Sequence, residues 1–202
     1  MRKHAEIFVF RHGETDWNRE GRFQGHTDVP LNEVGRAQAR SLIRALEGRG
    51  LEAVLASDLS RATETGQIVA DALGIPLHTH SGLREAHLGD AQGLTFEQIE
   101  ARFGSETLGR WRSSLPTDAD VAYPGGESGA EVMNRAFAAL EDFLRRHPFQ
   151  RVGVATHGGV VRRILQKLLP PHTPPVPIPN GILYRISRRE DGRWEFEPFT
   201  PV

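Results

Sequence analysis

Apolar residues in this chain form short continuous runs and longer runs with helical spacing. Ile7 to Phe10 form a continuous apolar run, which is typical of a buried strand covered on both faces. Residues 53–56 and the stretch RVGVAT at 151–156 predict two more strands. Near the C-terminus, ILYRI and WEFEPF flank Asp191-Gly192, a turn signal that predicts a hairpin.

The longer runs in the first half begin at residues that can cap a helix. Asn32 is expected to cap a helix that runs to about Leu46, and Ser57 or Asp58 to cap a helix that stops at Gly74. The first of these helices carries an apolar stripe at helical spacing, namely Val34, Ala39, Leu42, Ile43 and Leu46.

Two capping boxes predict helices in the second half of the chain. Thr95 with Gln98, and Ser128 with Glu131, place a hydroxyl residue three positions before a Gln or Glu. The first helix should end near residue 104 and the second before residue 148, with irregular chain over 105–126 and a last helix through about residue 169. Six prolines in PPHTPPVPIPNG, residues 170–181, predict a stiff, extended loop.

The order of these elements predicts the fold class. Strands alternate with helices, and an insertion at about 84–127 interrupts the alternation, so we expect a three-layer α/β/α sandwich with a mostly parallel mixed sheet. The length of 202 residues suits a single domain over 1–202, with the insertion as a small cap over one edge of the sheet.

Composition narrows the classes of function. The chain has no cysteine, which removes disulfides, thiolate metal sites and cysteine nucleophiles. The net charge is −1, so the basic excess typical of nucleic-acid binders is absent. No apolar run approaches the length of a membrane span. We therefore expect a cytoplasmic protein, a monomer or homodimer, that binds neither nucleic acid nor membrane.

Three of the predicted strands end in residues suited to anion binding. They are followed by Arg11-His12-Gly13, by Ser57-Asp58 with Arg61, and by Thr156-His157-Gly158-Gly159. Ligands of open α/β sheets bind beyond the carboxyl ends of the strands, and a cluster of cationic side chains there is costly unless an anion completes it. Glycines and helix N-termini at the same place favour a phosphate.

Taken singly, these residues have ordinary explanations. A histidine at a strand end is more often a hydrogen-bonded structural residue than a catalyst, and Arg61 alone suggests a solvated helix residue. His78 and His80 lie two positions apart without an acidic neighbour, which indicates a loop and not a metal site. Four aromatic residues of the insertion suit either an apolar mouth or the core, namely Phe96, Phe103, Trp111 and Tyr123.

Five sequence blocks in order carry a resemblance. They are FRHGETDWNREGRFQGHTDVPLNEVGRAQA, SDLSRATETGQIV, LREAHLGDAQGLTFEQI, YPGGESGAEV and VATHGGVVRRIL. Together they span roughly residues 5–187, and the chain resembles the histidine phosphatase superfamily, with its phosphoglycerate mutase-like fold, over that range.

The resemblance implies a role for each matching residue. His12 would be the nucleophile that becomes phosphohistidine, and Glu85 the general acid that protonates the leaving oxygen. Arg11, Arg61 and His157 would bind the phosphate oxygens and stabilise charge during transfer. The remaining candidate binding residues are Asn18, Gln24, Gly25 and Gly158.

This scheme requires neither a metal nor a cofactor, because guanidinium groups and an imidazole supply the charge stabilisation. His12 must be neutral at the attacking nitrogen, so its other ring nitrogen is expected to donate to a backbone carbonyl. Glu85 must hold a proton near neutral pH before transfer.

The superfamily contains phosphatases and mutases, and local residues favour the first. Mutases of phosphoglycerate typically read Glu-Arg-His-Tyr-Gly and carry a nearby Lys, whereas this chain has Ala86, Leu88 and, at the Lys position, Phe96. Gln24 is also the phosphatase-like choice. We expect a phosphatase acting on a small-molecule phosphate monoester, with phosphoglycerate mutase as the alternative.

A non-catalytic phosphate-binding module is an alternative from a different class. Such a protein generally lacks the nucleophile or the acid of its catalytic relatives. The presence of His12 and Glu85 therefore disfavours this interpretation.

Overall fold

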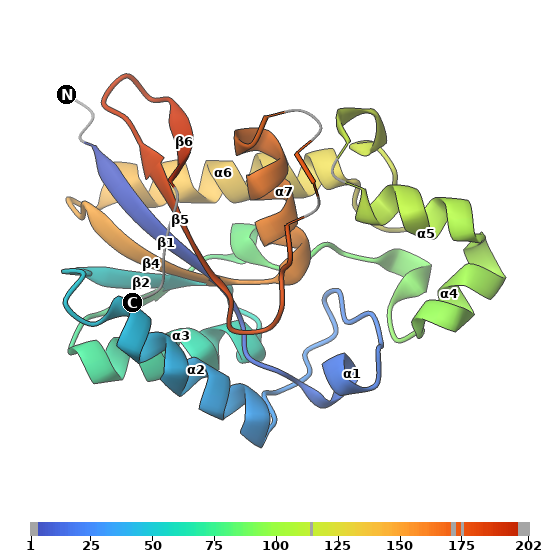
Figure 1. The fold of residues 1–202 in the computed structure, drawn as a ribbon, viewed down its shortest axis with the longest axis horizontal. Coiled ribbons are helices and arrows are strands. Elements are labelled where there is room, and N and C mark those ends of the chain that lie inside the picture. Colours follow the sequence, from blue (N-terminus) through green and yellow to red (C-terminus); the bar gives the residue numbers. More distant parts are fainter. Residues whose placement is uncertain (1–3, 114, 171–172, 175, 198–202) are drawn as a thin grey trace.

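A six-stranded mixed sheet runs through the middle of the protein (Figure 1). The structure is a computed structural model that describes residues 4–113, 115–170, 173–174 and 176–197. The strand order is β3-β2-β4-β1-β5-β6; the first four strands are parallel, and β5 is antiparallel to both of its neighbours, β1 and β6. The strands are β1 (Ala5–Arg11), β2 (Ala53–Ala56), β3 (Leu77–Thr79), β4 (Arg151–Thr156), β5 (Leu183–Arg188) and β6 (Trp194–Glu197).

Helices cover both faces of this sheet, so the predicted three-layer α/β/α class is confirmed. Helices α2 and α3 pack on one face, and α6 and α7 on the other (Figure 1). The helices are α1 (Asp16–Arg19), α2 (Glu33–Leu46), α3 (Ser60–Leu73), α4 (Phe96–Phe103), α5 (Ser105–Arg112), α6 (Gly129–Arg146) and α7 (Gly158–Leu168). Short 3₁₀ turns lie at Ser81–Leu83, Gly89–Ala91 and Pro116–Asp118.

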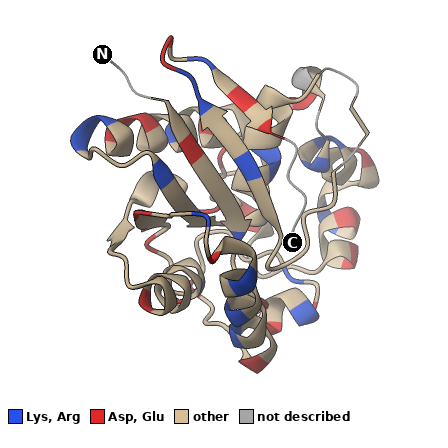
Figure 2. Ribbon diagram, turned by 60° about the vertical axis from the view of Figure 1, so that its left-hand side comes forward, with Lys and Arg blue, Asp and Glu red and all other residues tan. Residues whose placement is uncertain are grey.

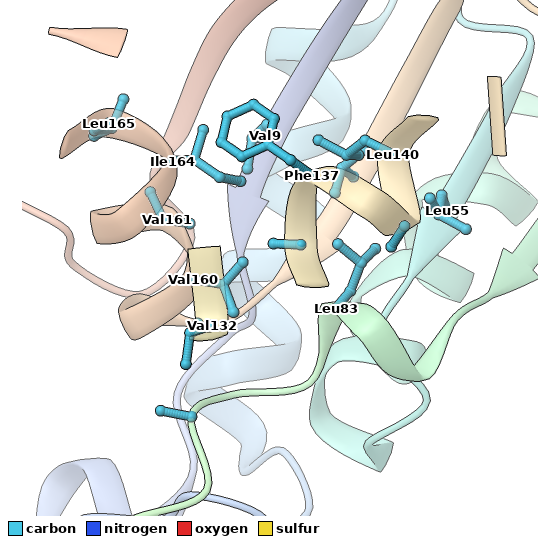
Figure 3. Close-up of a cluster of buried hydrophobic side chains, with 14 of the residues drawn as sticks. Val9, Leu55, Leu83, Val132, Phe137, Leu140, Val160, Val161, Ile164 and Leu165 are labelled. Atoms are coloured by element: carbon cyan, nitrogen blue, oxygen red, sulfur yellow. The ribbon is translucent and has the colours of Figure 1, made fainter. Parts of the chain in front are cut away.

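The continuous apolar run of β1 serves both faces because successive side chains of a strand point to opposite sides. Ile7 and Val9 belong to the core cluster beneath α6 and α7, whereas Phe8 and Phe10 belong to the cluster beneath α2 and α3. Figure 3 shows Val9 facing side chains of α6 and α7, among them Phe137. Burial on both faces makes β1 a rigid support for the residues that follow it.

Most predicted helix ends agree with the structure. The Asn32 side chain accepts from the Gly35 amide at the start of α2, and both capping boxes are formed at α4 and α6. Gly74 ends α3 in the left-handed conformation, with φ 66°. Within the predicted stripe of α2, Ala39, Leu42 and Leu46 are buried, but Val34 is 51% exposed because the buried face begins at Gly35 and not at Val34.

The predicted cap of α3 is wrong. Neither Ser57 nor Asp58 caps this helix, whose N-cap position is Leu59 without a side-chain hydrogen bond. Asp28, from a remote loop, accepts from the Ser60 amide at 2.8 Å, and Asp58 pairs with Arg84 at 2.6 Å. A tertiary contact therefore satisfies the helix terminus where a local cap was expected.

Strand β3 was not predicted, because its three residues are half-buried or exposed and have no apolar run. His78 lies in this strand and not in the expected loop. The described part of the chain holds no group of three or more His, Asp or Glu residues placed to bind a metal.

The insertion contains α5 in addition to the predicted α4, so the expectation of irregular chain over 105–126 is wrong for residues 105–112. The sequence pattern did not predict α5, because the residue at its N-cap position, Gly104, has no side chain that could cap the helix. The C-terminal end of α5 is held by Arg163, a buried residue of α7. Arg163 Nη2 donates to the Trp111 carbonyl at 2.6 Å, and Arg163 Nη1 donates to the Ser113 carbonyl at 3.0 Å. The two helices lie beyond the carboxyl ends of the central strands, not over an edge strand (Figure 1).

Charged residues of both signs are interspersed over the elements (Figure 2). No helix in the described ranges is long and apolar enough to cross a membrane. Pro171, His172 and Pro175 of the proline-rich loop lie outside the described residues, as do both ends of the predicted 1–202 domain. Residues 177–180 of this loop line the cavity described next.

Candidate active site

The polar strand ends converge because β2, β4 and β1 are neighbours in the sheet. A cavity of about 590 Å³ opens at their carboxyl ends, between the loop before α2, the insertion and the proline-rich loop. Eight of the nine predicted site residues line it, namely Arg11, His12, Asn18, Gln24, Gly25, Arg61, Glu85 and Gly158. The ninth, His157, is fully buried behind His12.

His12 is held with one ring nitrogen occupied. Its Nδ1 lies 2.6 Å from the carbonyl oxygen of Gly13, which can only accept, so Nδ1 carries the proton and Nε2 keeps its lone pair. A bond from this ring nitrogen to a backbone carbonyl was predicted from the sequence. Burial, reinforced by the charges of Arg61 and Arg11, holds the pKa of His12 well below its usual value. A neutral imidazole with a free Nε2 is a competent nucleophile.

Gly13 is required by a close approach of two backbones. A Cβ atom added to Gly13 would overlap the backbone of Gly35, because it would lie only 2.7 Å from the Cα atom of Gly35. The Gly13 amide also donates to the Thr65 hydroxyl of α3 at 3.1 Å. The turn after β1 is thus pressed against α2 and tied to α3, which fixes the direction of the His12 ring.

Arg11 and Arg61 present guanidinium groups that backbone carbonyls orient. Arg11 Nη1 donates to the Ile178 carbonyl at 2.6 Å, and Arg61 donates to the carbonyls of Gly25 at 2.8 Å and Thr27 at 2.9 Å. Within the described chain, the Nε of each is buried without a hydrogen-bond partner. Burial lowers the pKa of Arg11 to about 10, although the charge of Glu85 acts to raise this pKa. Both groups remain cationic at neutral pH.

His157 packs edge-on against His12, with ring centroids 5.1 Å apart. Both of its ring nitrogens are buried and lack a hydrogen-bond partner among the described residues. Burial and the charge of Arg61 lower its pKa well below the usual value, so this imidazole is also neutral. It can donate one hydrogen bond toward the cavity side without adding charge.

Glu85 lines the cavity, and its carboxyl group contacts the start of α7. Its Oε1 accepts from the Ala86 amide and its Oε2 from the Gly159 amide, each at 2.9 Å. Gly159 is in the first turn of α7, where the helix dipole favours a negative charge. A Cβ on Gly159 would overlap the Glu85 carboxyl group, which explains the second glycine of the THGG stretch.

The structure also brings residues to the cavity that were not assigned a role from the sequence. Asn180 donates from Nδ2 to the carbonyl oxygens of His12 at 3.0 Å and Gly13 at 3.2 Å, and to Oδ1 of Asn18 at 3.2 Å. Arg112 and Arg162 also line the cavity. Asn180 directly follows the proline run, which was the only signal available for it.

The aromatic residues of the insertion divide between the two expected places. Phe96 lines the cavity, Phe103 and Tyr123 pack in or against the core, and Trp111 belongs to both places. Phe96 is partly exposed and lies under the Arg112 guanidinium, whose carbon is 5.0 Å from the ring centroid. Burial raises the pKa of Tyr123 to about 12, so its hydroxyl stays protonated.

Comparisons with known proteins agree on one family. A family model described as the histidine phosphatase superfamily (branch 1) matches residues 7–199. Phosphoglycerate mutase-like protein 4 of Arabidopsis thaliana is 41% identical over 169 residues, which cover 83% of this chain and 72% of that protein. Metal-independent phosphoserine phosphatase of the same plant is 39% identical over 168 residues, covering 81% and 68%.

The fold agrees as well. The structure of a mycobacterial glucosyl-3-phosphoglycerate phosphatase in complex with VO3 superposes with a TM-score of 0.83. It is 30% identical in sequence, and the match covers 98% of this chain and all of that one.

Proposed function

Because this chain belongs to the histidine phosphatase superfamily, we propose that it hydrolyses small-molecule phosphate monoesters through a phosphohistidine intermediate. The observation that supports this most directly is the neutral His12 ring in one cavity with Arg11, Arg61 and Glu85. The cavity thus holds a nucleophile, two cationic groups for phosphate oxygens and a carboxyl group, which is the set that the reaction needs.

In the first step, the lone pair of His12 Nε2 attacks phosphorus, and the bond to the ester oxygen breaks. Glu85, as general acid, gives a proton to the leaving oxygen. Arg11 and Arg61 hold the equatorial phosphate oxygens while negative charge shifts, and His157 behind His12 donates to the same group. The products are a free alcohol and phosphohistidine.

In the second step, water attacks the phosphohistidine from the side that the alcohol left. The Glu85 carboxylate takes a proton from the water, the bond between nitrogen and phosphorus breaks, and inorganic phosphate leaves. His12 regains its lone pair and Glu85 its proton, so the cycle closes without another reactant.

The mutase alternative differs in what accepts the phosphoryl group, a second phosphoacid instead of water. The first prediction is that the purified protein releases phosphate from p-nitrophenyl phosphate and does not isomerise 3-phosphoglycerate in the presence of 2,3-bisphosphoglycerate. Excess EDTA should leave the rate unchanged, because guanidinium groups supply the charge stabilisation. Coupled assays for both products check this, and isomerisation faster than hydrolysis would favour the mutase.

Two arginines of the cavity lining suggest the substrate class. Arg112 and Arg162 form no ion pair and no side-chain hydrogen bond among the residues that the structure describes, although the charge of Glu85 acts on Arg162. Burial and the nearby Arg112 lower the pKa of Arg162. Unpaired cations next to the phosphate site favour a substrate with a second anionic group, such as a phosphorylated carboxylic acid. The phosphoserine and phosphoglycerate in the names of the relatives fit that class.

The second prediction tests this class with Arg112→Gln. The KM for O-phosphoserine should rise about tenfold, the loss expected for one charge-assisted hydrogen bond, while the KM for p-nitrophenyl phosphate stays nearly constant. Arg102→Gln is a matched control, since Arg102 also lies over an aromatic ring of the cap, 5.1 Å from the Phe103 centroid, outside the cavity lining. Equal changes for both substrates would contradict a second anion site.

A further inference from the structure

Arg135 of α6 donates three hydrogen bonds to the segment that carries Glu85 and two more to Glu127. Nη1 donates to the carbonyls of Gly82 at 3.0 Å and Arg84 at 2.6 Å, and Nη2 donates to the Glu85 carbonyl at 2.8 Å. Nε and Nη2 complete a two-pronged pair with Glu127, at 2.7 and 2.8 Å. The arginine side chain is largely buried, with 22% exposed.

Glu127 holds the other side of the same segment. Its Oε2 accepts from the His87 amide at 2.7 Å, and its own amide donates to the His87 carbonyl at 2.7 Å. Burial opposes the charge, but the hydrogen bonds from Arg135 and the His87 amide keep the pKa of Glu127 below its usual value. Glu127 is therefore a carboxylate that holds the chain after Glu85, at His87, while Arg135 holds Glu85 and the chain before it.

His26 adds a second donor to the Glu85 carbonyl. Its Nε2 lies 2.8 Å from that oxygen, which can only accept, so Nε2 carries a proton. The Glu85 main chain is thus held from α6 and from the loop before α2. None of these three side chains lines the cavity.

We propose that Arg135 and Glu127 form a positioning pair that holds the Glu85 carboxyl group in place for proton transfer. The inference rests on the proposed role of Glu85 as the acid. Proton transfer needs the donor within hydrogen-bond reach of the leaving oxygen, and a site of this kind tolerates errors of only about 0.5 Å. The side-chain bonds of Glu85 to Ala86 and Gly159 fix its carboxyl group only if the main chain is fixed as well.

The geometry of the guanidinium group is essential to this role. Its planar fork reaches three carbonyls and a carboxylate at once, whereas a lysine ammonium has three donors at a single point. Arg135→Lys keeps the charge and loses the fork. Glu127→Gln keeps the shape and removes the charge, so it tests the same pair from the other side.

The experiment compares a poor and a good leaving group. An alkyl phosphate needs a proton on its leaving oxygen, while p-nitrophenyl phosphate does not. In Arg135→Lys and Glu127→Gln, kcat for the alkyl phosphate should fall roughly 10- to 100-fold, with a much smaller fall for p-nitrophenyl phosphate. Arg188→Lys is the control, because Arg188 is a buried arginine paired with Glu141 at 2.7 Å away from the cavity. It should change thermal stability without separating the two substrates.

Glu85→Gln, measured in parallel, keeps this proposal apart from the one it rests on. If Glu85→Gln separates the substrates and neither network variant does, the positioning role is wrong and the acid role stands. If Glu85→Gln slows both substrates equally, the acid role itself fails, and the positioning role fails with it. A separation in Glu85→Gln and in either network variant supports both.

Discussion

Replacing His12 with alanine is expected to abolish turnover of phosphate monoesters. The Nε2 atom of His12 supplies the only nitrogen lone pair that the cavity offers to phosphorus among its described lining residues, since Nδ1 is bonded to Gly13 and the other basic residues of the lining are arginines. Loss of an enzyme's nucleophile removes the covalent route altogether, so kcat should fall by roughly four orders of magnitude or more. Steady-state phosphate release measures this directly.

His147→Ala is a suitable control for this result, because His147 lies at the end of α6 away from the cavity. Its rate should match that of the unmodified protein. Acid-quenched protein after mixing with substrate should carry phosphohistidine only while His12 is present. Turnover that survives in His12→Ala would remove the covalent scheme. Phosphate binding by the unmodified protein without any turnover would instead indicate a non-catalytic binding module.

Arg61→Lys is expected to lower kcat/KM by about two to three orders of magnitude, as for the loss of a preorganised donor to the transition state. Arg61 is completely buried, and two of its N–H groups already hold the Gly25 and Thr27 carbonyls. Its planar group can hold these carbonyls and a phosphate oxygen together, whereas the single nitrogen of a lysine cannot. The charge is conserved, so the loss reports geometry.

Arg36→Lys is the matched control for this substitution. Arg36 of α2 is likewise an arginine with a tertiary partner, a 2.6 Å pair with Glu64 of α3, but it lies outside the cavity and is partly exposed. We expect nearly unchanged kinetics for it. If Arg61→Lys retained full activity with a normal melting temperature, Arg61 would be a structural residue of the 25–27 loop and not a phosphate ligand.

Elements whose stability is set locally were predicted from the sequence. The apolar run of β1, the Asn32 cap of α2 and the capping boxes of α4 and α6 each depend on residues within a few positions of one another. The features that were wrongly predicted or missed depend on distant partners. The start of α3 is capped by Asp28, and α5, which was not predicted, ends against Arg163.

The site divides in the same way. Arg11 and His12 follow β1 directly, and parallel strands bring their carboxyl ends to one place, so the sequence pattern sufficed to predict that they meet Arg61. The matching motif identified Glu85 as well.

Only the tertiary structure revealed how these groups are held. Asn180 reaches His12 from a loop 168 positions away, and Arg135 reaches the Glu85 carbonyl from 50 positions away. The acceptor of each bond is a main-chain carbonyl, which every residue has. The pattern of side chains along the sequence therefore cannot predict these bonds. The pattern of residue types therefore set the chemistry of the site, and the folding of remote backbone onto a few buried donors decided its geometry.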